Sequence, residues 1–394
     1  MKNFNKYTLT ALMLLTTIVV AAQNSYKMAT VAFYNVENLW DTIQSVDIID
    51  GTKNYLDPGY HYSVAIDSPE ALATEKCKTE LTYEKLAGIK CKREQVLSDE
   101  FTPNGGSGWT YQRYHIKLDN MTKVIAQIGK DKTGTAPAIV GFAELENEIV
   151  LKDMIEHPNL KPYNYGMVHY NSFDARGIDV GLIYQKKRFI VESSQPYPIV
   201  IKDDETGNRD YTRDILRVDG YLDGEKIHIL VNHWPSRRGG EVASEPRRLK
   251  AAEVCLDIMK EIRATEPDAK IIVMGDFNDG PLNTSIRSLG TVAKKKDAAD
   301  DKMFNAMEET SSKGGGTAAF QDGWETLDQL IMSSSLLDSD LSSYKLYQTN
   351  VFMPSYLIQP SGEYKGYPFR TFSFGKFAGG YSDHFPVYLY LIKK

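Results

Sequence analysis

Short apolar segments recur along the chain, and most of them have the length of a single β-strand. Several are apolar at consecutive positions, which is typical of strands that are buried on both faces. The seven clearest segments are ATVAFYNV (29–36), PAIVGFAELE (137–146), DVGLIYQ (179–185), KIHILVNHW (226–234), AKIIVMGDFN (269–278), TLDQLIMS (326–333) and FPVYLYLI (385–392). We therefore expect a β-sheet core that is covered by other layers.

Helical periodicity is present in two segments between these strands, at 119–129 and 247–264. The second is expected to end near Pro267. One face of it carries Leu249, Ala252, Cys255, Met259 and Ile262. Cys255 is therefore expected to be a buried apolar residue and not a nucleophile. Strands that alternate with helices predict an α/β (α+β) fold.

The first 22 residues differ from the rest of the chain. Lys2 and Lys6 precede the apolar stretch ALMLLTTIVVAA, and the small residues of VAAQ end it. This order predicts a signal peptide at 1–22, and the stretch is short for a membrane-spanning helix. We expect an exported protein, periplasmic or secreted, with no transmembrane segment after cleavage. An uncleaved N-terminal anchor is the alternative.

Residues 23–394 are expected to form one catalytic domain. Within it, residues 43–118 are polar, rich in tyrosine and rich in turn residues, such as NGGSG at 104–108. We interpret this stretch as an elaboration on the domain. Cys77 and Cys91 lie close together there, and export makes a disulfide between them a candidate.

Composition and charge narrow the function classes. The chain is 42% hydrophobic and 25% charged, as expected for a soluble globular protein. Its formal net charge of −6 becomes −8 when the two lysines of the signal peptide are removed. An acidic surface argues against wide, sequence-blind contact with nucleic acid. It does not exclude an enzyme that cleaves phosphate esters with the help of bound cations.

Polar and ionisable residues gather where the predicted strands end. Taken singly, each could be a turn former, a rim carboxylate or a packed histidine. Their repetition at strand ends favours a common site, because strand ends can present side chains from a rigid scaffold. The residues are Asn35, Glu37, Glu144, Glu146, Asn147, His233, Asp276, Asn278, Asp328, Asp383 and His384.

These residues belong to motifs that occur in a known order: NVEN (35–38), GFAELEN (141–147), NHWPS (232–236), GDFN (275–278) and SDH (382–384). The set resembles the endonuclease/exonuclease/phosphatase superfamily, which includes deoxyribonucleases, AP endonucleases, inositol-polyphosphate phosphatases and bacterial sphingomyelinases. The resemblance implies a four-layered sandwich of two packed mixed β-sheets flanked by helices, with one site where strand ends of both sheets meet.

The resemblance also implies roles for individual residues. Glu144 would be the main ligand of a divalent cation, with Asn35 and Asp383 nearby. Oxygen ligands suit Mg²⁺ or Mn²⁺, and Ca²⁺ is a further candidate. Asp276 would orient or deprotonate the attacking water, and Asn278 would bind a phosphate oxygen.

Two histidines complete the implied machinery. His384, steadied by Asp328, and His233 would stabilise the charge that develops on the phosphoryl group or the leaving oxygen. Asp179 would orient His233.

Arginines are the implied anion contacts. Arg213 occupies the place of a family arginine near the phosphate, with Arg217 as the alternative. The alternative for both Asp179 and Arg213 is a surface salt bridge, which contributes little to stability. Arg237 begins a basic cluster that would contact an anionic substrate, although a solvated helix face explains its members Arg247 and Arg248 about as well.

Cleavage of a phosphodiester requires a nucleophilic water, neutralisation of a crowded anion and protonation of the leaving group, and these residues supply all three. We predict an exported, divalent-metal-dependent phosphoesterase, with a nuclease that hydrolyses nucleic acid as the favoured form. His233 motivates this choice, because AP endonucleases have tyrosine at that position. The alternatives are a phospholipid or inositol-phosphate hydrolase and a non-catalytic binding protein on this scaffold. We expect a monomer without a stable protein partner.

Overall fold

The computed structural model describes residues 26–43, 46–50, 92–96, 100–172, 174, 176–202, 209–210, 212–299 and 301–394. The predicted signal peptide, both cysteines of the candidate disulfide and most of the predicted elaboration at 43–118 lie outside these residues. The predicted single domain at 23–394 stays a prediction.

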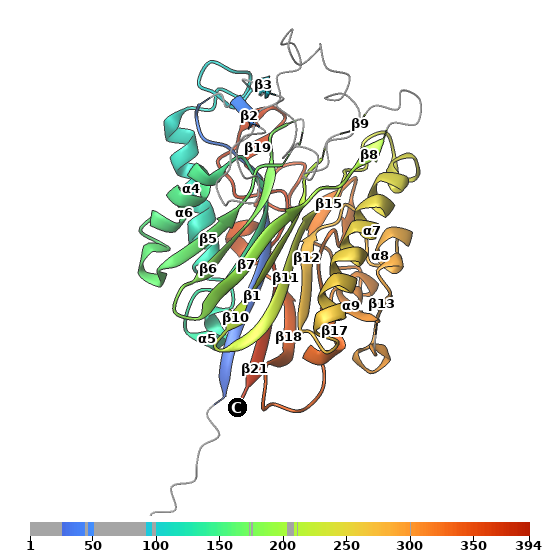
Figure 1. The fold of residues 1–394 in the computed structure, drawn as a ribbon. Coiled ribbons are helices and arrows are strands. Elements are labelled where there is room, and N and C mark those ends of the chain that lie inside the picture. Colours follow the sequence, from blue (N-terminus) through green and yellow to red (C-terminus); the bar gives the residue numbers. More distant parts are fainter. Residues whose placement is uncertain are drawn as a thin grey trace, which may run out of the picture.

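Two large mixed sheets form the centre of the molecule (Figure 1). The first sheet has the strand order β18 (Lys345–Val351), β21 (Val387–Lys393), β1 (Lys27–Leu39), β4 (Ile139–Leu145), β6 (Asp179–Gln185), β5 (Tyr165–His169). The second has the order β13 (Thr291–Val292), β14 (Met303–Asn305), β17 (Asp328–Ser333), β12 (Ile271–Asp276), β11 (Glu225–His233), β10 (Ile215–Leu222), β7 (Phe189–Tyr197). All seven strands expected from the apolar segments are present.

Four two-stranded ribbons add to these sheets. They are β2 (Val46–Asp50) with β3 (Lys92–Val96), β8 (Ile201–Lys202) with β9 (Arg209–Asp210), β15 (Ala318–Phe320) with β16 (Gly323–Glu325), and β19 (Phe372–Ser373) with β20 (Lys376–Phe377).

Helices cover the outer faces of both sheets (Figure 1). The helices are α4 (Tyr111–Ile125), α5 (Lys130–Thr133), α6 (Glu148–Glu156), α7 (Glu241–Thr265), α8 (Thr284–Ser288) and α9 (Glu308–Ser312). Single 3₁₀ turns lie at η1 (Lys161–Tyr163), η2 (Lys295–Asp297), η3 (Ser334–Leu336) and η4 (Ser355–Leu357). The arrangement is the four-layered sandwich that the sequence predicted. Among the described residues, no helix is both long and apolar enough to cross a lipid bilayer.

Helix starts follow from local capping. Thr110 caps α4 by accepting a hydrogen bond from the Arg113 backbone N–H, and Asn147 caps α6 by accepting from Ile149 and Val150. Asn147 is therefore a helix cap, although its position at the end of a strand had suggested a place in the common site. The helix predicted at 119–129 begins eight residues earlier, at Tyr111, because α4 opens with a mostly polar, tyrosine-containing turn.

Alternation along the strands sorts the apolar residues into three layers. In β12, Ile272 and Met274 pack between the two sheets, whereas Ile271 and Val273 pack against α7 and α8. Cys255 on α7 is fully buried in that outer layer, as predicted, and burial raises the pKa of its thiol to about 12. The same period of two decides which polar residues at the strand ends point between the sheets.

The sheets approach each other closely at Gly141 in β4. A Cβ atom at this position would lie 2.7 Å from the sulfur of Met274 and 3.2 Å from the methyl carbons of Val231, both on the opposite sheet. Glycine therefore sets the spacing of the two sheets at this point.

Replacing Gly141 by Val should overpack this contact and lower the free energy of unfolding by about 1–3 kcal/mol. Equilibrium unfolding in urea measures the change. Gly106→Ala is the matched control, because a Cβ atom there meets nothing within 4 Å. Equal stability of the two variants would contradict the close approach of the sheets.

Candidate active site

A polar cluster lies where the apolar rows between the sheets end. In β12, Ile272 and Met274 face the opposite sheet, and Asp276 is the next residue on that face. The same alternation ends in polar residues in three further strands, at Asn35 in β1, His233 in β11 and Asp328 in β17. His233 is the register partner of Asp276, and Asp276 that of Asp328, so these three side chains form one row across the second sheet.

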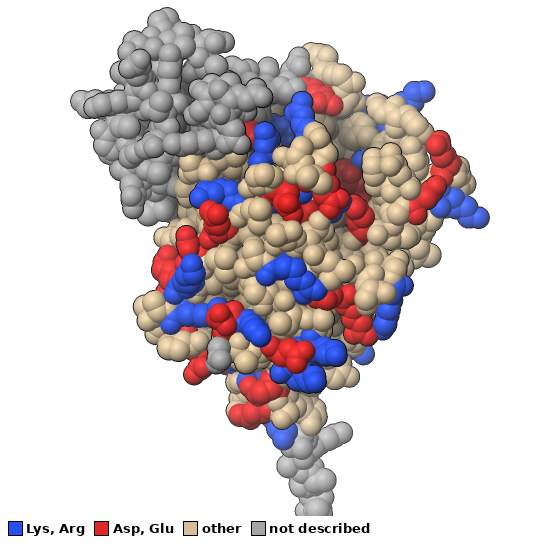
Figure 2. Space-filling model, turned by 90° about the vertical axis from the view of Figure 1, so that its right-hand side faces the viewer, with Lys and Arg blue, Asp and Glu red and all other residues tan. Residues whose placement is uncertain are grey.

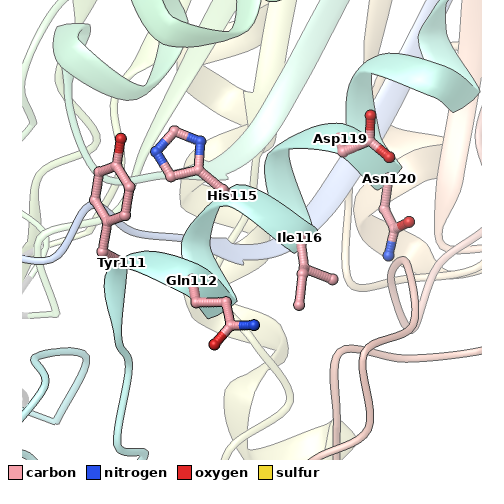
Figure 3. A pocket seen from close by; sticks show the side chains of 6 residues that line it. All are labelled: Tyr111, Gln112, His115, Ile116, Asp119 and Asn120. Atoms are coloured by element: carbon pink, nitrogen blue, oxygen red, sulfur yellow. The ribbon is translucent and has the colours of Figure 1, made fainter.

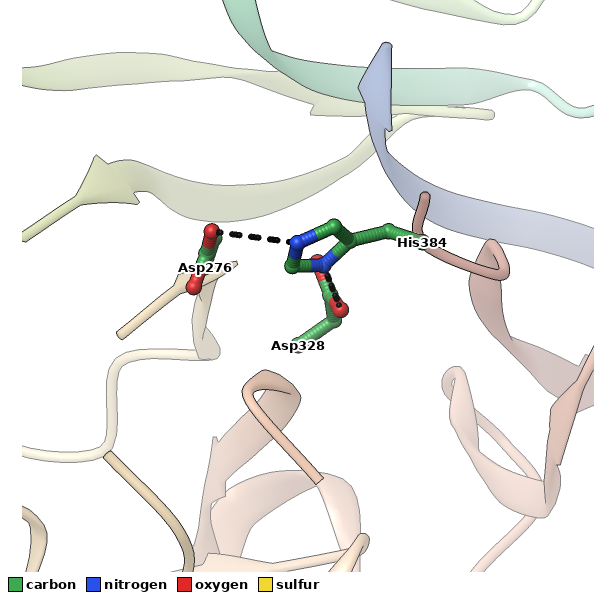
Figure 4. A group of neighbouring side chains, drawn as sticks. All are labelled: Asp276, Asp328 and His384. Carbon is green, nitrogen blue, oxygen red and sulfur yellow. Dashed lines mark hydrogen bonds and ion pairs between the residues drawn. The ribbon is translucent and has the colours of Figure 1, made fainter. Parts of the chain in front are cut away.

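His384 reaches this row from the other sheet. It precedes β21, and its Nδ1 lies 2.6 Å from Oδ2 of Asp328, while its Nε2 lies 3.9 Å from Oδ2 of Asp276 (Figure 4). Burial alone would lower the pKa of His384, but the carboxylates of Asp328 and Asp276 outweigh it and hold the pKa well above its ordinary value. The two carboxylates therefore favour the protonated form of His384.

Asp276 is held in place by donors to both of its oxygens. The amide of Asn35 donates to Oδ2 over 3.0 Å, and the backbone N–H of Asn278 donates to Oδ1 over 2.9 Å. Burial raises the pKa of Asp276, against the opposing effect of the His384 cation. A buried carboxylate with a raised pKa is a better proton acceptor than an exposed one.

A backbone irregularity turns Glu144 toward the cluster. By strict alternation its side chain would point away from the other sheet, but the register shifts between Ala143 and Leu145, and Glu144 has a φ of 65°. Its Oε2 accepts a hydrogen bond from the Asn38 N–H, and its Oε1 lies 3.9 Å from Nε2 of His233. The strained backbone thus places a largely buried carboxylate, with 14% of its side chain exposed, in the site.

Asp383 and Glu37 bring further negative charge to the same place. Oδ2 of Asp383 accepts from Arg370 over 2.9 Å, and the same guanidinium donates to Glu37 over 3.0 Å. Burial raises the pKa of Glu144, and the charge of Asp383 raises it further. Burial also raises the pKa of Glu37, and the negative charge of Asp383 raises it further.

Three positively charged side chains lie close to these acids, and none of them was predicted from the sequence to belong to the site. Arg370 pairs with Asp383 and Glu37, and Nη2 of Arg176 lies 3.9 Å from Glu144. Lys117 of α4 is fully buried and donates to the hydroxyl of Thr371 and the carbonyl of Tyr381, and its charge acts on Glu37. They come from helices and loops distant in sequence, so no strand-end pattern points to them.

His233 differs from His384 in charge. Burial, followed by the charges of Arg213 and Arg176, lowers the pKa of His233 well below its ordinary value. The ring is therefore neutral at pH 7, and it can offer one N–H donor. Its Nδ1 is buried without a hydrogen-bond partner among the described residues.

The predicted orientation of His233 by Asp179 is wrong in this structure. Asp179 accepts from the backbone and side chain of Ser172, and its Oδ2 lies 3.1 Å from Nε2 of His169. The reason is alternation in β6: its neighbour Val180 points between the sheets, so Asp179 points to the opposite face. Asp179 therefore interacts with Ser172 and His169 and not with the ring of His233.

Arg213, and not the alternative Arg217, is the arginine beside the cluster. It is buried, pairs with Asp174 over 3.0 Å and donates to the carbonyl of Trp234, the residue after His233. Arg217 instead pairs with Asp219 and Glu261, a residue of α7. The proposed contact of Arg213 with phosphate stays a prediction.

The loop that follows Asp276 is fixed by a second set of polar contacts. Asn278 has a φ of 50°, and its side-chain amide donates to the Trp234 carbonyl over 2.9 Å. Arg237 donates to the Asn278 carbonyl over 2.7 Å and pairs with Glu325, so a structural contact already engages the guanidinium that was expected to bind substrate.

Two further arginines of the basic cluster do not form an anion-binding face. Arg248 is completely buried against the carboxylate of Asp279, and Arg247 pairs with Asp210. The buried pair anchors α7 to the loop after β12. It therefore supports the position of Asp276 without touching a substrate.

Two sets of side chains could hold a divalent cation. Asp276, Asp328 and His384 place ligand atoms within 4.8 Å of one another, but two of these three are joined by the short Nδ1–Oδ2 hydrogen bond. Glu144 and Asp383 offer only oxygen ligands, and their negative charges repel each other. Hard oxygen donors with excess negative charge fit Mg²⁺ or Mn²⁺, which retain several waters. Glu144 and Asp383, two members of the set predicted from the sequence, therefore offer the donor type that such a cation prefers. The third member, Asn35, donates to Asp276 and accepts from the Glu37 N–H, and the ligand set stays a prediction.

A surface hollow of about 440 Å³ on α4 is separate from this cluster (Figure 3). It is lined by side chains of a single helix between Tyr111 and Asn120, with the ring of His115 4.1 Å from that of Tyr111. None of the clustered residues lines it. A second cavity, of about 420 Å³, does border the cluster and includes Asp383 and Arg370.

Comparison with known proteins identifies the family. Residues 90–393, more than half of the chain, match the Endonuclease/Exonuclease/phosphatase family. The chain therefore belongs to this family, whose members hydrolyse phosphoester bonds. A search of the curated proteins gives no match.

Solved structures to which this chain is similar include two from Bacteroides thetaiotaomicron. An endonuclease/exonuclease/phosphatase family protein is 16% identical with a TM-score of 0.49, and the match covers 94% of this chain and 99% of that one. A mannosyl-6-phosphatase is 16% identical with a TM-score of 0.47 and coverage of 92% and 99%. The catalytic domain of human nocturnin is 14% identical, with a TM-score of 0.44 and coverage of 72% and 87%.

The pair of Asp328 and His384 gives a test of the site's electrostatics. In Asp328→Asn, the largest charge that keeps His384 protonated is lost while its burial remains, so the pKa of His384 should fall. Histidine NMR titration of the metal-free protein measures it. Asp338→Asn is the control, because this carboxylate is exposed and pairs with Lys345. An unchanged pKa in Asp328→Asn would show that the carboxylate does not set the charge of this ring.

Proposed function

We propose that the protein is an exported, divalent-metal-dependent phosphoesterase whose active site is the polar cluster between the two sheets. The observation that carries this proposal is the convergence of Asp276, His233 and the Asp328–His384 pair beside the carboxylates of Glu144 and Asp383. Export rests on the pattern of residues 1–22 alone.

Asp276 is the group that orients and deprotonates the attacking water. Asn35 and the Asn278 backbone occupy one lone pair on each of its oxygens, and these donors fix the direction of the carboxylate. His384 and His233 lie on either side of it, with their Nε2 atoms 3.9 and 3.7 Å from Oδ2. A phosphoryl group placed between the two rings would therefore lie within reach of the water that Asp276 holds.

The two histidines have different tasks because their charges differ. The imidazolium of His384 stabilises negative charge that grows on the phosphoryl oxygens, while the neutral ring of His233 donates one hydrogen bond. A divalent cation held by Glu144, Asp383 and Asn35 would act as a Lewis acid that neutralises the phosphate. Arg176 and Arg370 keep these carboxylates in place.

Hydrolysis breaks one P–O bond of the ester. The oxygen of water ends on phosphorus, one proton of water is taken by Asp276, and the leaving oxygen receives a proton from the site or from solvent. The carboxylate is regenerated when Asp276 loses its proton to solvent. Atoms and charges therefore balance without a further co-reactant.

Nucleic acid is the substrate that the sequence analysis favoured. Figure 2 shows acidic and basic side chains interspersed over one face of the molecule, and no broad basic band covers the described part of that face. Wide contacts with a phosphate backbone need such a band. We therefore propose phosphate esters as the substrate class. Hydrolysis rates on nucleic acid, phospholipid and small phosphate esters distinguish the possible substrates.

The proposal predicts that Asp276→Ala lowers kcat by about 10²–10⁴-fold, because a positioned acid–base group is lost. The measurement is hydrolysis of bis-nitrophenyl phosphate, plasmid DNA, RNA and sphingomyelin with Mg²⁺ or Mn²⁺, and with EDTA, which should abolish turnover. Asp257→Ala is the control, since this exposed acid of α7 pairs only with Lys260 at the surface. Turnover that survives EDTA, or near-wild-type rates in Asp276→Ala, would refute the assignment. Absence of metal-dependent turnover on every ester would favour the non-catalytic binding protein.

A further inference from the structure

The cavity next to Asp383 is built from two segments that are far apart in the sequence. One wall is the β15–β16 hairpin with Phe320, Gln321 and Asp322, and the other is the loop that carries Glu363 and Tyr364. Its volume of about 420 Å³ is within the range of small-molecule sites, about 300–1,000 Å³. Because Asp383 lines both this cavity and the catalytic cluster, a phosphate ester bound at the cluster would extend one substituent into the cavity.

The hairpin wall is tied directly to the catalytic histidine. Ala318 in β15 forms a β-bridge with His384, and the Phe385 N–H donates to the carbonyl of Thr317 over 2.7 Å. The backbone that positions His384 therefore also positions the cavity wall. A substituent bound in the cavity would hold its phosphate at a fixed place relative to the ring of His384.

The tip of the hairpin is held in an uncommon conformation that shapes the cavity. Gln321 and Asp322 have φ values of 47° and 61°, which non-glycine residues rarely adopt. The hydroxyl of Tyr367 braces this turn, because it accepts from the Asp322 N–H and donates to the Asp322 carboxylate, each over 2.7 Å. These bonds join the two walls of the cavity to each other.

Three aromatic rings and three carboxylates are part of the lining. The side chains of Phe320 and Tyr364 are 70% and 37% exposed, and the rings of Tyr364 and Tyr367 lie 5.6 Å apart. Exposed aromatic groups at a cavity mark a binding surface. Asp322 and Glu363 add carboxylate oxygens, which accept hydrogen bonds but cannot donate them when ionised.

The charge of the cavity excludes a second phosphate group. Asp322, Glu363 and Asp383 are acids, and the guanidinium of Arg370 is already paired with Asp383 and Glu37. A polynucleotide would bring a further anion into these acids. A neutral ring with many hydroxyl groups would instead donate hydrogen bonds to the carboxylates and stack its C–H face on the aromatic rings.

We propose that this cavity binds a hexose ring and that the substrate of the site is a sugar phosphate. This inference rests on the proposed phosphoesterase function and specifies its substrate class. Hydrolysis breaks the P–O bond to the sugar, the oxygen of water ends on phosphorus, and a proton ends on the released sugar hydroxyl. The hexose is the leaving group, held by the hairpin and by the loop that carries Tyr364.

Phosphate release from glucose, mannose and galactose 6-phosphates, compared with release from ethyl phosphate, tests the inference. Both kinds of substrate have an alkyl leaving group, so the difference reports the sugar ring. The protein should prefer at least one hexose 6-phosphate by at least about tenfold in kcat/KM, because the carboxylates of the cavity would accept hydrogen bonds from the hydroxyl groups of the sugar. Equal kcat/KM values, or a preference for phosphocholine or for a dinucleotide, would overturn it.

Variants of the cavity separate sugar binding from the chemistry. Tyr364→Ala and Glu363→Gln should raise KM for the preferred hexose 6-phosphate by about tenfold and leave hydrolysis of ethyl phosphate unchanged. Tyr347→Ala, an exposed aromatic residue of β18 that is 51% exposed, is the control and should change neither reaction. Equal losses on both substrates, or no loss on either, would contradict the role of the cavity.

Binding without turnover distinguishes this inference from the proposed function. Calorimetric titration of Asp276→Asn with Mn²⁺ should give a Kd for the hexose 6-phosphate at least about tenfold lower than for ethyl phosphate. If that difference is found while the wild-type protein hydrolyses no ester, the cavity assignment stands and the phosphoesterase proposal fails. If bis-nitrophenyl phosphate is hydrolysed but the two Kd values are equal, the phosphoesterase stands and the sugar site fails.

Discussion

The site depends on the alignment of the two sheets at one end of the sandwich. Two hydrogen bonds cross between them there: Asn35 of the first sheet donates to Asp276 of the second, and His384 of the first pairs with Asp328 of the second. Neither sheet holds all of these groups by itself. Close packing between the sheets, including the approach at Gly141, keeps the crossing distances short. Packing of apolar side chains is thus what brings the chemistry together.

Charge is distributed unequally over this assembled site. The second sheet supplies Asp276 and Asp328, whose carboxylates raise the pKa of His384, while Glu144 and Asp383 add further negative charge beside the two histidines. Partly buried acids that repel one another are costly unless cations compensate them. Arg176 and Arg370 do so in part, and a hard divalent cation would complete the compensation. The same residues therefore support both the proposed cation site and a raised pKa of His384.

Much of the fold and of the site could be predicted from the sequence. The seven apolar segments each have the length of one strand, and the polar residues at their ends continue the alternation of side chains along the strand. Strands β7 and β10 were missed, because polar residues such as Glu192 and Asp219 interrupt their patterns. Asp179 was misassigned because a shift of one residue in a strand reverses the face of a side chain. Lys117 and Arg370 could not be found, since ion pairs between distant segments exist only after folding.

A crystal structure grown with Mn²⁺ and phosphate tests the central claim most directly, because anomalous scattering locates the ion. The account predicts the manganese at the carboxylates of Glu144 and Asp383, with the phosphate facing His384 and His233 and the Asp328–His384 hydrogen bond intact. A manganese ion bound instead by Asp276, Asp328 and His384, with that hydrogen bond broken, would contradict the assignment of the cation to Glu144 and Asp383.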